Sequence, residues 1–219
     1  HDVRLGLEPE ENQAWRLQII SNDLSGEAVF PHNPQQAMTI NLQTLALPFA
    51  VDDSYAAKST KLADDWLIPK MNIHVEDLSL KAWPKLAHSQ LNTQLIPTAK
   101  GIRLNNIIVK SPVFSIEGAM DWQWRGIENT SYSGQINIPN IANLFSAFNA
   151  VPVLNSQQAT SQLSLNWQGN PTDLSLGSMS GQLFVDLKKG RVLNLNRTVS
   201  LSRLLGVLDS DNIKRRLKF

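Results

Sequence analysis

The chain of 219 residues contains no cysteine. This absence excludes a disulfide scaffold, a zinc–thiolate site, an iron–sulfur cluster and a thiol nucleophile. Charged residues are also scarce, at 18%, and their signs nearly cancel, with 20 Lys and Arg against 19 Asp and Glu. Apolar residues make up 42%, which is too many for an intrinsically disordered chain. The composition therefore indicates a folded chain that can bury a sizeable core.

The sequence also lacks a long hydrophobic run. The longest unbroken apolar stretch, Leu45–Val51, covers seven residues, whereas a membrane-spanning helix needs about 20. The chain opens with His1-Asp2-Val3-Arg4, which is neither an initiator Met nor the start of a signal peptide. We therefore expect a mature piece or an excised segment of a longer protein.

Motifs that carry catalysis or bind metal are missing as well. The stretch 177–181 approaches the Gly-x-Ser-x-Gly elbow of hydrolases but has Met179 at the nucleophile position. The four His residues are scattered, and no glycine-rich phosphate loop follows a strand. The stretch 209–212 begins like a calcium loop but lacks its later Gly and Glu. We predict that the chain is not an enzyme and holds no metal or cofactor.

What the sequence does contain is an alternation of apolar and polar residues with the period of a β-strand. Turn signals such as Pro97–Gly101, Gly126 and Gly169–Pro171 separate the alternating runs. Many short strands spaced by turns predict a meandering antiparallel sheet, and hence a mainly β fold. The runs are Trp15–Ile19, Met38–Leu47 with one slip in the alternation, Ile73–Val75, Leu91–Leu95, Ile102–Val109, Phe114–Trp124, Ile136–Ile138, Leu163–Trp167 and Leu183–Leu187.

Two stretches have the period of a helix instead. In Ile141–Phe148 the apolar residues recur at i, i+3, i+4 and i+7, and Asn140 precedes them as a suitable N-cap. Leu201–Leu208 repeats that spacing after Thr198. We predict two short amphipathic helices that cover part of the apolar face of the sheet.

Polarity and charge are unevenly distributed along the chain. The segment 51–66 is polar and has neither period, so we expect a flexible loop between N-terminal strands at 1–50 and a β domain at 67–219. Residues 188–219 hold nine basic and two acidic groups, a net +7, and the remainder carries 11 − 17 = −6. A basic end can meet anionic lipid or an acidic neighbour. No nucleic-acid-binding module surrounds it, so we expect no nucleic-acid partner.

The stretch from Leu163 to Leu193 carries a family pattern. It reads LSLNWQGNPTDLSLGSMSGQLFVDLKKGRVL, with a strand ending W-x-G-x-P, then L-x-L, a small turn, G-x-L and a strand ending K-x-G-R. The amphipathic stretch 201–208, the strand 118–124 and the extended start at 67–80 occur in the matching order. In these features the chain resembles the AsmA-like superfamily of Gram-negative envelope proteins, and within it most closely the YhdP family. The resemblance covers about residues 66–219 and, more weakly, 13–48, and the family pattern continues beyond Phe219.

The resemblance implies a long, curved antiparallel β-sheet rolled into an open groove, which resembles a taco shell. It implies a periplasmic segment of a protein that is anchored in the inner membrane and carries phospholipid toward the outer membrane. The expected partners are phospholipid, the membranes reached by the parent protein, and envelope proteins, with the fragment itself a monomer. An acyl chain can slide along such a groove because hydrophobic contact is non-directional.

The predicted groove assigns roles to three sets of residues. The lining is Ile73, Val75, Leu91, Leu95, Leu104, Ile116, Met120, Trp122, Trp124, Ile136, Ile138, Leu163, Leu165, Trp167, Leu183, Val185 and Leu187. The helices would cap the groove with Leu144, Phe145, Phe148, Leu204 and Leu205, and Lys214, Arg215 and Arg216 would attract lipid headgroups.

Two other readings remain open at this point. A non-enzymatic scaffold for outer-membrane biogenesis would bind protein strands along exposed sheet edges. A sugar-binding β-sandwich would present Trp side chains on an exposed face with polar neighbours. Trp122, Trp124 and Trp167 instead occupy the apolar positions of the alternation, which argues against this role. Alternation alone does not separate an open groove from a closed sandwich, since both need the same pattern.

Overall fold

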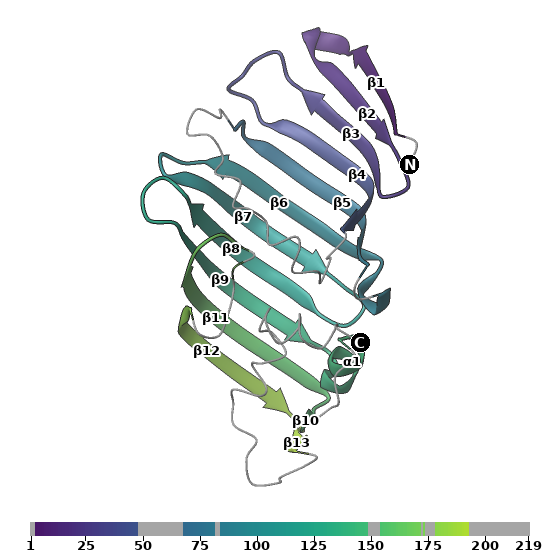
Figure 1. Cartoon of the computed structure of the whole chain (residues 1–219). Helices are drawn as coiled ribbons and strands as arrows, with labels where there is room; N and C mark the ends of the chain where they lie inside the picture. Colours follow the sequence, from purple (N-terminus) through teal and green to yellow (C-terminus); the bar gives the residue numbers. More distant parts are fainter. Residues whose placement is uncertain are drawn as a thin grey trace, which may run out of the picture.

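A computed structural model shows one long, curved β-sheet (Figure 1). The structure describes residues 3–47, 68–81, 84–148, 154–171, 173 and 178–192. The strands are β1 (Arg4–Pro9), β2 (Trp15–Ile20), β3 (Leu24–Phe30), β4 (Met38–Leu47), β5 (Met71–Leu80), β6 (Ser89–Pro97), β7 (Gly101–Lys110), β8 (Ser115–Gln123), β9 (Asn129–Ile138), β10 (Leu154–Asn155), β11 (Gln158–Gln168), β12 (Met179–Lys188) and β13 (Arg191–Val192). A helix, α1 (Ile141–Ala147), and the short 3-10 turns η1 (Glu11–Gln13) and η3 (Pro84–Leu86) complete the described elements.

The strands of the large sheet are arranged almost in the order of the sequence. Eleven strands pair as β1-β2-β3-β4-β5-β6-β7-β8-β9-β11-β12, and β10 pairs with β13 in a separate two-stranded sheet. Tight turns make this arrangement possible. Between β6 and β7, for example, Thr98 N donates to Gly101 O at 2.8 Å, and Gly101 N donates to Thr98 Oγ1 at 3.0 Å. The predicted meander is therefore confirmed for most of the chain.

One pairing corrects the prediction of an entirely antiparallel sheet. β4 and β5 run parallel, with Met38 opposite Met71 and Leu47 opposite Leu80. A parallel neighbour requires a crossover connection of a dozen or more residues, and the connection from Leu47 to Met71 provides that length. Residues 48–67 of this connection, and with them the predicted loop at 51–66, lie outside the described residues.

The slip in the alternation of β4 is a β-bulge. Leu42 lies opposite Gly26 and Thr44 lies opposite Ser25, so Gln43 has no partner in β3. The extra residue keeps Leu42 and Leu45 on the same face of the sheet although they are three positions apart. The predicted slip is thus confirmed.

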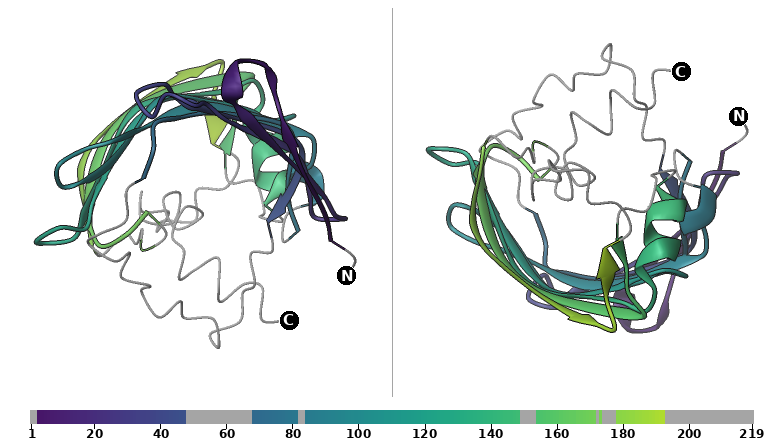
Figure 2. Two further views of the ribbon diagram at one scale, coloured as in Figure 1. Left: turned by 90° about the horizontal axis from the view of Figure 1, so that it is seen from above. Right: turned by 90° about the horizontal axis from the view of Figure 1, so that it is seen from below.

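The strands are curved, so that the sheet forms an arc when it is viewed from either edge strand, and α1 lies on the inner side of this arc (Figure 2). Asn140 caps this helix as predicted, because its Oδ1 accepts hydrogen bonds from Ala142 N at 2.9 Å and Asn143 N at 3.2 Å. The second predicted helix, at 201–208, lies outside the described residues.

Candidate functional site

A row of apolar side chains crosses the whole sheet at right angles to its strands. Residues that lie directly opposite each other on paired strands share one face, so the register can be followed from edge to edge. The apolar row consists of Leu5, Ile19, Gly26, Leu42, Val75, Leu91, Val109, Ile116, Ile136, Ser161 and Val185. Eleven strands leave ten intervals of about 4.8 Å, so the row is about 48 Å long measured along the sheet.

The predicted lining residues belong to the same face as the apolar row. The registers place sixteen of the seventeen on it, and in that sense bring them together into one surface. The remaining residue, Trp124, follows the end of β8, and its ring centroid lies 4.8 Å from that of Trp122. Trp122 Nε1 donates to Glu128 Oε1 at 3.1 Å, which fixes the ring near the strand end.

Burial on the apolar face varies along the sheet. Val75 on β5 and Ala159 on β11 are buried, with 0% and 1% of their surface exposed. At the edges, Leu5 on β1 is 68% exposed and Val185 on β12 is 53% exposed. The face is therefore open to solvent at both edge strands, where contiguous exposed apolar side chains mark a binding surface.

Buried polar side chains also lie within the apolar face, among them Thr93, Thr130 and Ser161. The Ser161 hydroxyl is buried in the apolar row and has no hydrogen-bond partner among the described residues. Thr130, opposite Trp122 and Trp167, is fully buried and donates to Gly169 O at 2.7 Å. Such a buried unpaired hydroxyl costs about 1–3 kcal/mol, so Ser161 lowers stability at a point where Ala or Val would fit the pattern better.

α1 is held at its C-terminal end by a lysine of η3. Lys85 Nζ donates to Ser146 O at 2.9 Å and to Ser146 Oγ at 3.0 Å, which ties the last turn of the helix to η3. Of the predicted capping residues on this helix, Phe145 is buried, and Leu144 and Phe148 are half-buried. Leu204, Leu205, Lys214, Arg215 and Arg216 lie outside the described residues.

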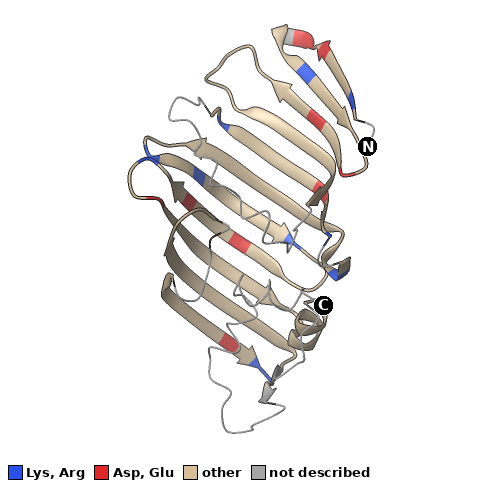
Figure 3. Cartoon of the chain, viewed as in Figure 1, with Lys and Arg blue, Asp and Glu red and all other residues tan. Residues whose placement is uncertain are grey.

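The opposite face of the sheet is polar. Its charged pairs include Arg103 Nε to Asp121 Oδ1 at 2.8 Å and Arg16 Nη1 to Glu27 Oε2 at 3.3 Å. The hydrogen bond and the charge of Asp121 raise the pKa of Arg103. Figure 3 shows such charges at several places on the sheet, whereas β9 and β11 contain no charged residue.

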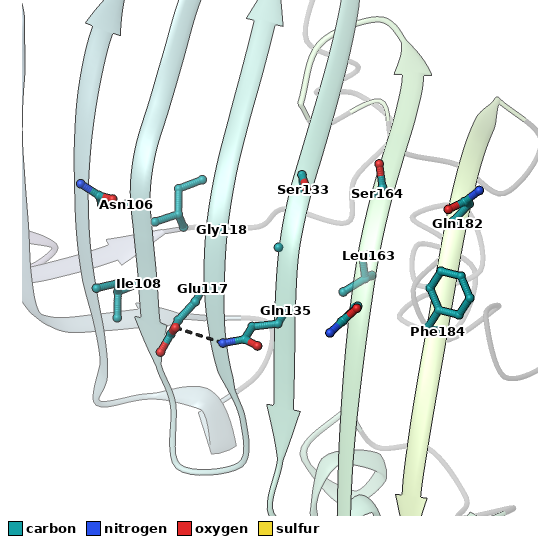
Figure 4. A pocket seen from close by; sticks show the side chains of 13 residues that line it. Asn106, Ile108, Glu117, Gly118, Ser133, Gln135, Leu163, Ser164, Gln182 and Phe184 are labelled. Carbon is teal, nitrogen blue, oxygen red and sulfur yellow. Dashed lines mark hydrogen bonds between the residues drawn. The ribbon is translucent and has the colours of Figure 1, made fainter.

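A hollow of about 730 Å³ lies on this polar face, over the uncharged strands β9 and β11 and their neighbours (Figure 4). It crosses β7, β8, β9, β11 and β12 and is lined largely by polar-face side chains, among them Glu117, Gln135, Gln162 and Phe184. Gln135 Nε2 donates to Glu117 Oε2 at 3.1 Å. Sequence reasoning missed this hollow because it treated the polar positions of each strand as ordinary solvated surface.

Comparison with family models decides the classification. The model described as "YhdP protein" matches residues 1–219, the whole chain. The chain belongs to the YhdP family. No curated protein matches it, and no solved structure matches it either.

Membership of the YhdP family extends over more of the chain than the sequence motifs indicated, since the match includes β1 and the segment before Trp15. In this YhdP-family chain the described residues contain no group of three or more His, Asp or Glu side chains that could hold a metal ion. None of the described helices is long and apolar enough to cross a membrane.

Proposed function

We propose that this chain is a periplasmic segment of an open β groove, within a protein anchored in the inner membrane, and that the groove carries phospholipid between the two membranes of a Gram-negative cell. The apolar face is the floor of the groove, and acyl chains lie along it across the strands. The role is non-enzymatic, and the chain needs no cofactor. Membership of the YhdP family supports this proposal, because the family resemblance implies lipid transport.

The observation that carries the proposal is the apolar row. The row has one residue on each of the eleven strands, and nine of these eleven residues are Leu, Ile or Val. A sheet that only needed a core could end after a few strands, whereas a conduit needs apolar surface along its whole length. Neighbouring rows on the same face, such as Ile138, Ala159 and Leu187, widen the strip.

The energetics of such a strip suit transport. Each methylene removed from water contributes about 0.8 kcal/mol, so an acyl chain on the strip is held against release into water. Hydrophobic contact has no preferred direction. When the acyl chain moves from one strand to the next, it therefore exchanges one set of apolar contacts for a similar set. The bound lipid can therefore move along the sheet without crossing a high barrier at any one site.

Exposure at the two ends of the apolar face also supports the proposal. Leu5, Leu7 and Trp15 are exposed on β1 and β2, and Leu183 and Val185 are exposed on β12. A groove that passes lipid onward needs open apolar surface where it meets the next segment. An ordinary monomer would bury or remove these side chains.

The test is native mass spectrometry with lipid extraction on the whole chain, using a matched pair of variants. Leu165 and Asn166 are neighbours in β11 on opposite faces, since Leu165 lies opposite Tyr132 and Asn166 lies opposite Ser131. We expect phospholipid to co-purify with the wild type and with Asn166→Asp, and to be lost from Leu165→Asp. Val185→Asp, at an exposed position, gives the same test without risk to folding. Wild-type chain free of phospholipid after exposure to vesicles, or equal retention by all variants, would contradict the proposal.

A scaffold that binds envelope proteins is the second candidate, and the sheet edges favour it. β1 and β12 have no further partner strand within the described part of the chain, and both carry exposed apolar residues. An unpaired edge can receive a strand from another protein. Peptide capture that is blocked by a proline in β12, with no lipid bound, would favour this role.

A further inference from the structure

We propose that the hollow on the polar face binds a linear, uncharged glycan chain across the strands. The site lies on the other side of the sheet from the apolar row, so it is separate from the proposed lipid groove. Its floor is a row of polar-face residues in which Glu117 lies opposite Gln135, Gln135 opposite Gln162, and Gln162 opposite Phe184. We call these four residues the glycan row.

The shape of the hollow suits an extended ligand. It spans five strands from β7 to β12, which leaves four intervals of about 4.8 Å and gives a length of about 19 Å. The row runs at right angles to the strands, so a ligand on it meets a different strand at each step. Figure 4 shows the labelled side chains arranged in this way, from Glu117 on β8 to Phe184 on β12.

The chemistry of the hollow points to hydroxyl and amide groups as the ligand's contacts. Gln162, Gln182, Ser133 and Ser164 all line it, and none of their side chains makes a hydrogen bond to another residue in the described part of the chain. Amides and hydroxyls both donate and accept, which matches the mixed donors and acceptors of a sugar. Their lack of partners leaves that capacity available for a ligand.

The charge pattern excludes several other ligands. All polar-face positions of β9 and β11 are Ser, Thr, Asn or Gln, and Glu117 is the single charged residue that lines the hollow. A carboxylate repels phosphate and other anions, which argues against a nucleic acid or an anionic headgroup. Glu117 can instead accept hydrogen bonds from neutral hydroxyls, and Gln135 holds its Oε2 at 3.1 Å.

Phe184 supplies the apolar contact that such a site needs. Its side chain is 65% exposed although it belongs to the polar face, directly opposite Gln162. Among the described strands, it is the one aromatic residue placed by register on that face. An aromatic ring beside convergent amides can pack against the apolar face of a sugar ring while the amides bind its hydroxyls.

The experiment titrates the whole chain with two soluble probes, N-acetylglucosamine oligomers and β-1,4-linked glucose oligomers, and follows binding by calorimetry and by saturation-transfer NMR. We expect at least one oligomer to bind, and Phe184→Ala and Gln162→Ala each to weaken binding by about tenfold, the change that loss of one such contact produces. Asn166→Ala is the matched control, because Asn166 lies on the same face of β11 outside the hollow. It should bind like the wild type.

Three results would overturn the proposal. One is no binding of either oligomer at millimolar concentration by a chain whose circular dichroism shows a folded β-sheet. Another is equal affinity in Phe184→Ala, Gln162→Ala and the wild type. The third is a loss of affinity in Asn166→Ala as large as that in the hollow variants. Lipid retention by Phe184→Ala is measured in parallel. Because Phe184 lies on the polar face, this variant should retain lipid like the wild type, which separates a failure of the glycan site from a failure of the lipid groove.

Discussion

Gly118 of β8 lies directly opposite Gly134 of β9, and the Tyr132 side chain lies over both. A Cβ built on Gly118 would stand 2.7 Å from Tyr132 Oη, and one built on Gly134 would overlap the same oxygen and Glu117 O. Tyr132 Oη also donates to Glu117 O at 3.3 Å. The two glycines therefore allow the Tyr132 ring to lie flat on the apolar face. Both glycines also border the hollow, which lies on the opposite face of the sheet.

We expect Gly134→Ala to destabilise the chain by about 1–3 kcal/mol, because the new methyl group has no space between Tyr132 and the neighbouring strand. Chemical denaturation followed by circular dichroism measures the change. Gly6→Ala is the control, since its nearest neighbour would be Gln18 Cβ at 3.8 Å. Equal stability of Gly134→Ala and Gly6→Ala would contradict the packing described here.

Burial raises the pKa of Tyr132 from its ordinary value of 10.0. The unfolded chain therefore loses this proton at a lower pH than the folded chain, so the contribution of Tyr132 to stability is intact below about pH 10 and is lost as the pH rises through the folded pKa. In a Tyr55→Phe background, Tyr132 is the remaining tyrosine. Absorbance titration should then show ionisation above pH 10 in the folded chain, and ionisation at or below pH 10 would refute the burial.

The contribution of the α1 N-cap to stability should be measurable by chemical denaturation. Asn140→Ala removes the acceptor of two backbone N–H groups and should cost about 1 kcal/mol. Asn143→Ala, at an exposed position inside the helix, should have little effect or a slightly stabilising one. Hydrogen exchange localises the loss, because protection should fall in 141–147 and remain unchanged in β9. A fall in protection spread evenly over the sheet would show that the cap does not act locally.

The alternation of apolar residues was enough to predict most strands and the face that each residue occupies. Leu163, Leu165 and Trp167 lie on one face of β11, and Gln162 and Ser164 on the other, as the period requires. The bulge at Gln43 could also be recognised as a slip. The predicted runs did not include the strands β1 and β3. In β3, Ser25, Gly26 and Glu27 weaken the alternation.

Other features could not follow from local pattern. The parallel pairing of β4 and β5 depends on the path of a long connection, and an alternating strand fits either direction. The glycan row depends on register, which places Glu117, Gln135, Gln162 and Phe184 in line although they are far apart in the sequence. A signal did exist, because the polar positions of 129–138 and 158–168 contain no charged residue, but only the paired strands show that these positions adjoin.

The measurement that tests the central claim most directly is photo-crosslinking of lipid from opposite faces of β12. Val185 lies on the apolar face, opposite Ser161, and Ser180 lies on the polar face, opposite Asn166. A photoreactive residue is placed at one position or the other, the chain is incubated with phospholipid vesicles and irradiated, and crosslinked lipid is detected by mass spectrometry. We predict phospholipid adducts from position 185 and none above background from position 180. Equal labelling from both positions, or labelling from position 180 alone, would contradict a lipid groove on the apolar face.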